Sequence, residues 1–141
     1  MPYNLSPFSE TVKKPWGYEL IFTPPNLART GKLLHVLAGK RLSLQYHDQK
    51  EETLCLISGK ALLWLEDSSG EIQKIPMELN QGYTVLPPQK HRIESVEDCV
   101  IAEVSMPETG TTFRLDDDYK RADETEEMRK EKDRGWQSSA L

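Results

Sequence analysis

Residues with metal-ligand chemistry recur across one short stretch of the chain at spacings that β-strands can exploit. Gln45 and His47 alternate with apolar residues, as expected for a half-buried strand, and residues two apart on a strand point to the same face. A predicted turn over residues 48–51 follows, and Glu52 opens the next strand-like run. We therefore expect a hairpin in which one amide oxygen, one imidazole and one carboxylate approach a common point.

A second imidazole comes from further along the chain. His91 follows the segment Leu86-Pro87-Pro88-Gln89-Lys90, after another strand-like run. Two nitrogen and two oxygen ligands suit a borderline divalent metal such as Zn, Mn, Fe, Co or Ni. The sequence therefore predicts one divalent metal ion held by Gln45, His47, Glu52 and His91. The remaining histidine, His35, is interpreted as an ordinary strand residue.

Short strand-like runs separated by turn residues fill most of the chain. The segment Asp67-Ser68-Ser69-Gly70 is a strong hairpin signal between two of them. No long helical period interrupts the series, which favours an all-β sandwich or barrel. The expected strands cover residues 18–22, 32–37, 42–46, 53–57, 61–65, 71–75, 84–86, 92–96 and 99–104.

The C-terminal stretch has a different composition. Residues 116–134 hold nine acidic and six basic side chains. Asp123 is a good N-cap, and mixed charges at i,i+4 spacing favour a helix over residues 123–132. We expect a helical or disordered tail, with Trp136 as an apolar anchor for the barrel or a second subunit.

Composition limits the classes of partner. A chain of 141 residues suits one compact domain. A net charge of −5 argues against binding to nucleic acid or to membrane surfaces, and no apolar run is long enough to span a bilayer. Cys55 and Cys99 lie in apolar segments and are interpreted as buried free thiols. No secretory signal is visible, and we expect a cytoplasmic protein.

The spacing of the candidate ligands resembles the first motif of the cupin superfamily, Gly-x5-His-x-His-x3,4-Glu-x6-Gly. Here it reads Gly39-x5-Gln45-x-His47-x4-Glu52-x6-Gly59, with glutamine at the first ligand position. The segment from Gly82 to His91 partly matches the second cupin motif. The resemblance implies the double-stranded β-helix, or jelly-roll barrel, of the cupins. We assign residues 1–121 to the cupin domain and residues 122–141 to a charged C-terminal tail.

A narrower resemblance is to the cupin domain of type II mannose-6-phosphate isomerases. It is carried by residues 12–19 (VKKPWGYE), 42–47 (LSLQYH), 91–94 (HRIE) and 113–121 (FRLDDDYKR). Glutamine at the first ligand position is usual in that family, so Gln45 fits it. The resemblance implies a metal-dependent aldose–ketose isomerase acting on a sugar phosphate similar to mannose 6-phosphate. The metal would act as a Lewis acid while a proton moves between C1 and C2.

A sugar phosphate needs cations near the metal. Lys32 is expected to point inward because it shares strand parity with Leu34 and Val36, and it matches a lysine common in the isomerase family. We predict Lys32 and Arg92 as catalytic residues and a homodimeric assembly. No general base can be assigned. The predicted substrate-binding residues are Lys13, Lys14, Arg41, Lys50, Arg114 and Arg121.

Two other function classes stay open. His47, Glu52 and His91 also match the two-histidine, one-carboxylate set of non-haem iron oxygenases, which would make the chain a metal-dependent dioxygenase. Thr53 and Leu54 depart from the isomerase pattern, where His and Trp are typical. They keep a non-catalytic sugar-binding or small-molecule-binding cupin possible.

Overall fold

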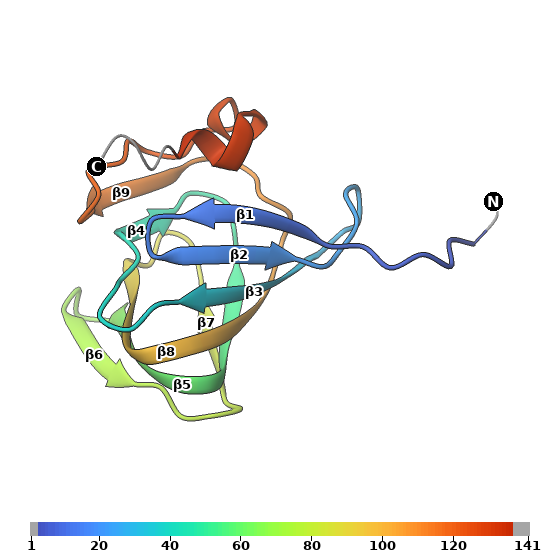
Figure 1. The fold of residues 1–141 in the computed structure, drawn as a ribbon. Coiled ribbons are helices and arrows are strands. Elements are labelled where there is room, and N and C mark those ends of the chain that lie inside the picture. Colours follow the sequence, from blue (N-terminus) through green and yellow to red (C-terminus); the bar gives the residue numbers. More distant parts are fainter. Residues whose placement is uncertain (1–2, 137–141) are drawn as a thin grey trace.

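The computed structural model describes residues 3–136, and within them the chain is built from strands, as the sequence predicted (Figure 1). No α-helix occurs in this part of the chain. Two short 3₁₀ turns, η1 (Met128–Lys130) and η2 (Lys132–Gly135), lie near its end. The strands are β1 (Glu10–Lys14), β2 (Gly17–Ile21), β3 (Thr30–Val36), β4 (Leu44–His47), β5 (Glu52–Glu66), β6 (Ile72–Pro76), β7 (Gly82–Val85), β8 (His91–Ser105) and β9 (Thr112–Asp116).

The strands form one strongly curled antiparallel sheet. Its order is β1-β2-β3-β8-β4-β9, and β5 pairs with β6, β7 and β8. Figure 1 shows β1, β2 and β3 on one side of the molecule, with β5, β6 and β8 curling away beneath them. The C-terminal turns lie over the end of the barrel that carries β9. This curvature encloses an interior into which alternate residues of each strand point.

Strands β5 and β8 are longer than the sequence suggested. Each merges two of the expected runs into a strand of 15 residues. Their shared ladder changes register between Leu56 and Ala61, so the strand bends there without ending. Gly59 has a φ of 83°, and a Cβ at this position would lie 2.1 Å from the carbonyl oxygen of Asp98. Only glycine fits this bulge, which gives a structural reason for the last glycine of the motif.

The hydrophobic core fills the barrel beside the candidate metal ligands. Leu34, Leu54, Leu63 and Ile101 are at most 3% exposed. The hairpin turn after β5 forms as predicted, and the carboxylate of Asp67 accepts hydrogen bonds from the backbone N–H groups of Ser69 and of Glu71, which follows the turn. Cys99 is buried and Cys55 half-buried, and both are free thiols. The described residues contain no helix long and apolar enough to cross a membrane.

The helix expected over residues 123–132 is wrong. Asp123 does not cap a helix; its carboxylate accepts a hydrogen bond from the backbone of Arg114. The backbone of Glu124 pairs with Thr112 in a β-bridge, and the Glu124 side chain is buried. Contacts with the barrel therefore override the local helix propensity of this segment. Trp136 packs edge-on against Tyr119 of the same chain, with ring centroids 6.2 Å apart.

Candidate metal centre and the charged pocket beside it

Three predicted metal ligands meet inside the barrel. One ligand atom from each of His47, Glu52 and His91 lies within 4.8 Å of the others, and all three residues are buried. Oε1 of Glu52 lies 2.9 Å from Nε2 of His91 and 3.4 Å from Nε2 of His47. Ligand atoms about 2.1 Å from one ion are about 3.0 Å apart at right angles and about 3.4 Å apart at tetrahedral angles. The observed separations fit a shared ion.

The hydrogen bonds of the two imidazoles leave their inner nitrogens free. Nδ1 of His91 lies 2.9 Å from the carbonyl oxygen of Gln89, which can only accept, so Nδ1 carries the hydrogen. Nδ1 of His47 lies 2.9 Å from the hydroxyl oxygen of Thr112. Both Nε2 atoms are buried with no hydrogen-bond partner among the described residues. These free nitrogens facing a carboxylate fit a divalent cation.

Burial and neighbouring charges favour the ligand forms that a metal needs. Burial lowers the pKa of His47 below its ordinary value, which favours the neutral imidazole. Burial by itself would raise the pKa of Glu52. The nearby Lys50 cation is the largest opposing effect, and the pKa is held well below its usual range. Neutral imidazoles and an ionised carboxylate are the forms that bind metal.

The ligands do not converge through the predicted hairpin, and that expectation is wrong. Strand β4, which carries His47, pairs with β8 and β9, whereas β5 pairs with β6, β7 and β8. Glu52 and His91 each open a long strand, and they sit at opposite ends of the β5–β8 ladder. The curl of the sheet brings these two ends together across the barrel. The ligand cluster is therefore a product of barrel closure.

Gln45 lies on the same strand as His47 and lines the same pocket. Its Cα pairs with that of His91 across β4 and β8. Its Oε1 accepts a hydrogen bond of 2.6 Å from the hydroxyl of Ser43. Coordination of the metal by Gln45 stays a prediction.

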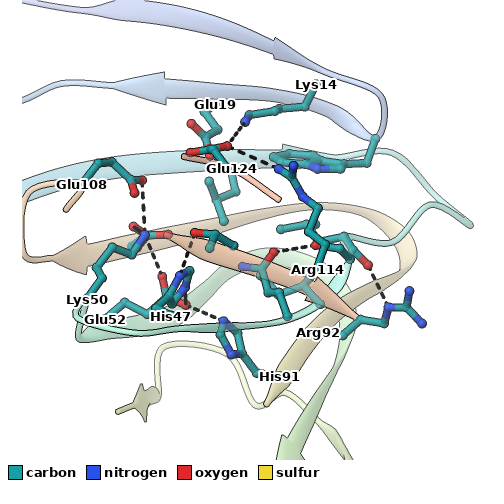
Figure 2. Close-up of a pocket in the computed structure, with 18 of the residues that line it drawn as sticks. Lys14, Glu19, His47, Lys50, Glu52, His91, Arg92, Glu108, Arg114 and Glu124 are labelled. Carbon is teal, nitrogen blue, oxygen red and sulfur yellow. Dashed lines mark hydrogen bonds and ion pairs between the residues drawn. The ribbon is translucent and has the colours of Figure 1, made fainter. Parts of the chain in front are cut away.

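A dense set of buried charges lies beside the ligands (Figure 2). Nζ of Lys50 is 3.3 Å from a carboxylate oxygen of each of Glu52, Glu103 and Glu108. Burial would lower the pKa of Lys50, but these carboxylates raise it well above its usual value, so Lys50 is a cation. Lys32 contacts Glu108 at 2.5 Å and Glu19 at 3.5 Å. The wall next to the metal ligands thus contains one buried cation, Lys50, that is paired with several carboxylates.

The C-terminal segment adds a second charged cluster around Glu124. Its Oε2 lies 3.6 Å from Nζ of Lys14 and 3.3 Å from Arg114, while its Oε1 contacts Arg129 and Arg134 at 2.9 and 3.2 Å. Figure 2 shows Lys14, Glu124 and Arg114 at the far side of the pocket from His91. The tail therefore closes the pocket with ion pairs.

The predicted catalytic and substrate-binding residues divide into two groups. Lys14, Lys50, Arg92, Arg114 and Arg121 line the pocket. Arg92 donates to the backbone carbonyls of Leu42 and Asp116, so it braces the barrel, and Arg121 is paired in two contacts with Asp117.

The other three predicted residues do not line the pocket, although their assigned roles stay predictions. Lys32 is buried behind the pocket wall, at 1% exposure, with its charge directed to acidic partners. Lys13 is exposed on β1, because it alternates with the buried Lys14. Arg41 is paired with Asp118 outside the pocket.

Sequence reasoning missed several residues of the site. Glu103 shares inward parity with Ile101 and Ser105 on β8, so a charged residue at an inward position was a usable signal. Thr112 faces His47 across β4 and β9, but β9 was not among the expected strands. Nothing local in the sequence indicates that Glu108 and Arg134 reach the pocket.

The pocket is narrow. Its volume is about 50 Å³, which is room for one or two water molecules. Ligand pockets for small organic molecules usually measure about 300–1,000 Å³. A sugar phosphate can reach the ligands only if part of the wall moves.

The sequence matches no protein-family model and no curated protein. Its structure is similar to several solved structures. Oxalate decarboxylase of Lactobacillus farciminis, solved as a formate complex, aligns with a TM-score of 0.65 and 16% identity over 82% of this chain. The capsular polysaccharide assembling protein CapF of Staphylococcus aureus aligns with a TM-score of 0.60 and 14% identity over 85%. KdgF from Halomonas sp. aligns with a TM-score of 0.59 and 13% identity over 71%.

The chain spans 37% of that oxalate decarboxylase chain, 33% of the CapF chain and 87% of the KdgF chain. At these identities the likeness concerns the fold alone. Together with the curled antiparallel sheet, it shows that the chain has the cupin double-stranded β-helix. The expected fold class is confirmed, and a group able to bind metal lies inside the barrel.

Proposed function

We propose that the protein is a metal-dependent sugar-phosphate isomerase. The observation that carries this proposal is the convergence of His47, Glu52 and His91 next to the buried cation Lys50. A divalent metal held there would act as a Lewis acid toward a carbonyl and its neighbouring hydroxyl. Lys14, Lys50 and Arg114 line the pocket and supply positive charge for a phosphate. Mannose 6-phosphate and fructose 6-phosphate are the first pair to test.

Isomerisation also needs a group that moves a proton between two carbons. Glu103 lines the pocket, where it accepts a hydrogen bond from Ser105 and lies 3.3 Å from Lys50. Burial raises its pKa above the ordinary value, toward the range useful for proton transfer at neutral pH. We assign the proton transfer to Glu103, with Lys50 positioning its carboxylate.

Exchange of solvent deuterium into C2 of hexose phosphates tests the reaction directly. We expect exchange by metal-loaded protein, and a loss of about 100-fold or more in Glu52→Gln, which removes the anionic ligand. Glu51→Gln is the matched control, because Glu51 is the adjacent residue and its side chain is exposed. Glu103→Gln should lose exchange while it retains metal. If metal-loaded protein neither exchanges nor converts any hexose or pentose phosphate, the isomerase proposal fails.

The composition of the ligand cluster favours a second candidate. Among the described residues, the His, Cys, Asp and Glu side chains that come together as a possible metal site are two histidines and one glutamate. The same set holds Fe(II) in non-haem oxygenases. Oxygen consumption by Fe(II)-loaded protein with an organic acid or sugar substrate would favour a dioxygenase over an isomerase. Tight binding of a sugar phosphate without turnover would favour a binding protein.

The assembly and location of the protein are further proposals. We expect a homodimer in the cytoplasm, with a small-molecule sugar phosphate as ligand. Sedimentation equilibrium of the full chain tests the dimer, and a single species with the mass of one chain would exclude it.

A further inference from the structure

Glu108 and Arg134 form a partition between two hollows. Both residues line the inner pocket of about 50 Å³ that holds the metal ligands. Both also line an outer hollow of about 250 Å³, together with Phe8, Ile21 and Arg29. The guanidinium of Arg134 lies 3.3 Å from Oε1 of Glu108. Opening this pair would join the two hollows, and the joined space reaches the lower end of ligand pockets, about 300 Å³.

The carboxylate of Glu108 is held by an unusual number of cations. Oε1 lies 2.5 Å from Nζ of Lys32 and 3.3 Å from Nζ of Lys50, besides its contact with Arg134. Oε2 lies 3.7 Å from a guanidinium nitrogen of Arg129. Lys32 and Lys50 also contact Glu19, Glu52 and Glu103, and Arg129 and Arg134 also contact Glu124, so Glu108 is the carboxylate that all four cations share. The same donors in the same positions suit a dianionic phosphate.

Glu108 is also the acidic group best placed to leave. It lies on the connection between β8 and β9, whereas Glu19, Glu52 and Glu103 lie on strands. Its side chain is 16% exposed, compared with 4% for Glu52 and 5% for Glu103. Rotation of this side chain on its loop leaves the barrel ladder unbroken.

The turn that carries Arg134 is strained in the closed arrangement. Asp133 and Arg134 have φ values of 47° and 56°, and neither is glycine. Consecutive side chains in the left-handed region cost free energy, which surrounding contacts must offset. Here those contacts include ion pairs from Arg134 to Glu108 and Glu124. Loss of the Glu108 contact would therefore favour release of the turn.

We propose that Glu108 occupies the binding position of a phosphate group, and that a phosphate monoester enters from the outer hollow by displacing Glu108 from Lys32, Lys50 and Arg134. Glu108 is then an internal competitor that keeps the metal pocket closed until a dianion replaces it. This inference rests on the proposed function, because it takes the ligand to be a sugar phosphate.

Binding of inorganic phosphate to the full chain tests the proposal, by titration calorimetry at constant ionic strength. We expect Glu108→Gln to bind phosphate about tenfold or more tightly than wild type, since the competing charge is gone. Glu71→Gln makes the same charge change at an exposed site on the far hairpin and should bind as wild type does. Adding Lys32→Gln to Glu108→Gln should remove the gain. A folded Glu108→Gln variant that binds no more tightly than wild type overturns the proposal.

Hydrogen exchange of the wild-type protein provides a test that needs no variant. Saturating phosphate should speed amide exchange in residues 106–111, because Glu108 leaves its cations. Unchanged or slower exchange there would contradict the displacement. These outcomes are separate from isomerase activity. Tighter phosphate binding by Glu108→Gln without any turnover would leave the phosphate position standing and remove the isomerase. Turnover without tighter phosphate binding by Glu108→Gln would leave the isomerase proposal standing and reject the proposed phosphate position.

Discussion

Nε2 of His91 lies 2.9 Å from Oε1 of Glu52, and in the neutral imidazole neither atom carries a hydrogen. The hydrogen of His91 is on Nδ1, which donates to the carbonyl oxygen of Gln89. Two lone pairs at this distance in a buried site repel each other unless a cation lies between them. The hydrogen bond to Gln89 leaves Nε2 of neutral His91 free, so His91 and Glu52 are able to bind a metal together.

Replacement of His91 by alanine should remove the metal. We expect about one divalent ion per wild-type chain and an affinity at least about tenfold lower in His91→Ala, because one of three clustered ligands is lost. Elemental analysis of protein purified without added metal measures the content. His35→Ala is the control, because His35 stacks on Tyr18 and is not part of the ligand cluster. Equal metal content in wild type and His91→Ala would reject the assigned site.

The hydroxyl of Thr112 should contribute to metal affinity without touching the metal. Thr112→Val keeps the shape of the side chain but removes the partner of His47 Nδ1. We expect a loss of about 10–100-fold in metal affinity, which is typical for residues that orient a ligand. Competition with a chelator measures the affinity. Thr111→Val changes the neighbouring residue, which is less buried, and should bind as wild type does. If Thr112→Val binds metal as tightly as Thr111→Val and wild type do, Thr112 does not orient His47.

Local patterns were enough to predict most of the strands, although not β1 or β9, and to nominate the ligands. Alternation on β3 correctly indicated that Lys32 points inward with Leu34 and Val36. Gln45, His47 and Glu52 line the same pocket in the structure, because only a short connection separates the end of β4 from the start of β5. These features depend on residues close in sequence, where strand period and turn chemistry decide the conformation.

Pairings between distant segments could not be predicted in the same way. The hairpin expected around residues 48–51 is absent, because β4 pairs with β8 and β9. Glu124 is buried because Lys14, Arg114 and other cations surround it, and those partners come from different strands. The composition of the charged segment by itself favours a solvated helix. The end of the barrel that binds this segment forms only when strands distant in the sequence come together.

The burial of Glu124 should make stability depend on pH. Burial by itself would raise its pKa, but Lys14, Arg134 and Arg129 lower the pKa well below the ordinary value of 4.5. A lowered carboxyl pKa stabilises the folded state above pH 4.5, and the contribution is lost as the pH falls through the folded-state pKa.

Glu124→Gln should therefore reduce the free energy of unfolding by about 3 kcal/mol at pH 7, since buried cations lose their partner. The difference from wild type should shrink between pH 4.5 and pH 3. Denaturant unfolding of wild type and Glu124→Gln at pH 7 and at pH 3 measures this difference in the free energy of unfolding. Glu127→Gln is the control, because its side chain is 85% exposed. A difference that is equal or larger at pH 3 would show that the Glu124 charge does not stabilise the fold.

Lys13 and Lys14 provide the sharpest comparison among the predicted phosphate contacts. They are adjacent on β1 and point to opposite sides, with Lys13 exposed and Lys14 buried at 9% exposure. Lys14 lines the pocket and lies 3.6 Å from Glu124, whereas only the backbone of Lys13 is engaged, with Asp133.

Lys14→Gln should weaken binding of mannose 6-phosphate about tenfold or more, the usual loss for a charged contact. Lys13→Gln should change it less than about twofold, because an exposed charge on the outer face is screened by solvent. Titration calorimetry of both variants at one salt concentration separates the effects of the inner and outer faces. Equal losses would mean that the ligand senses only the overall charge of the protein. No loss in Lys14→Gln would mean that the phosphate contacts lie on other strands.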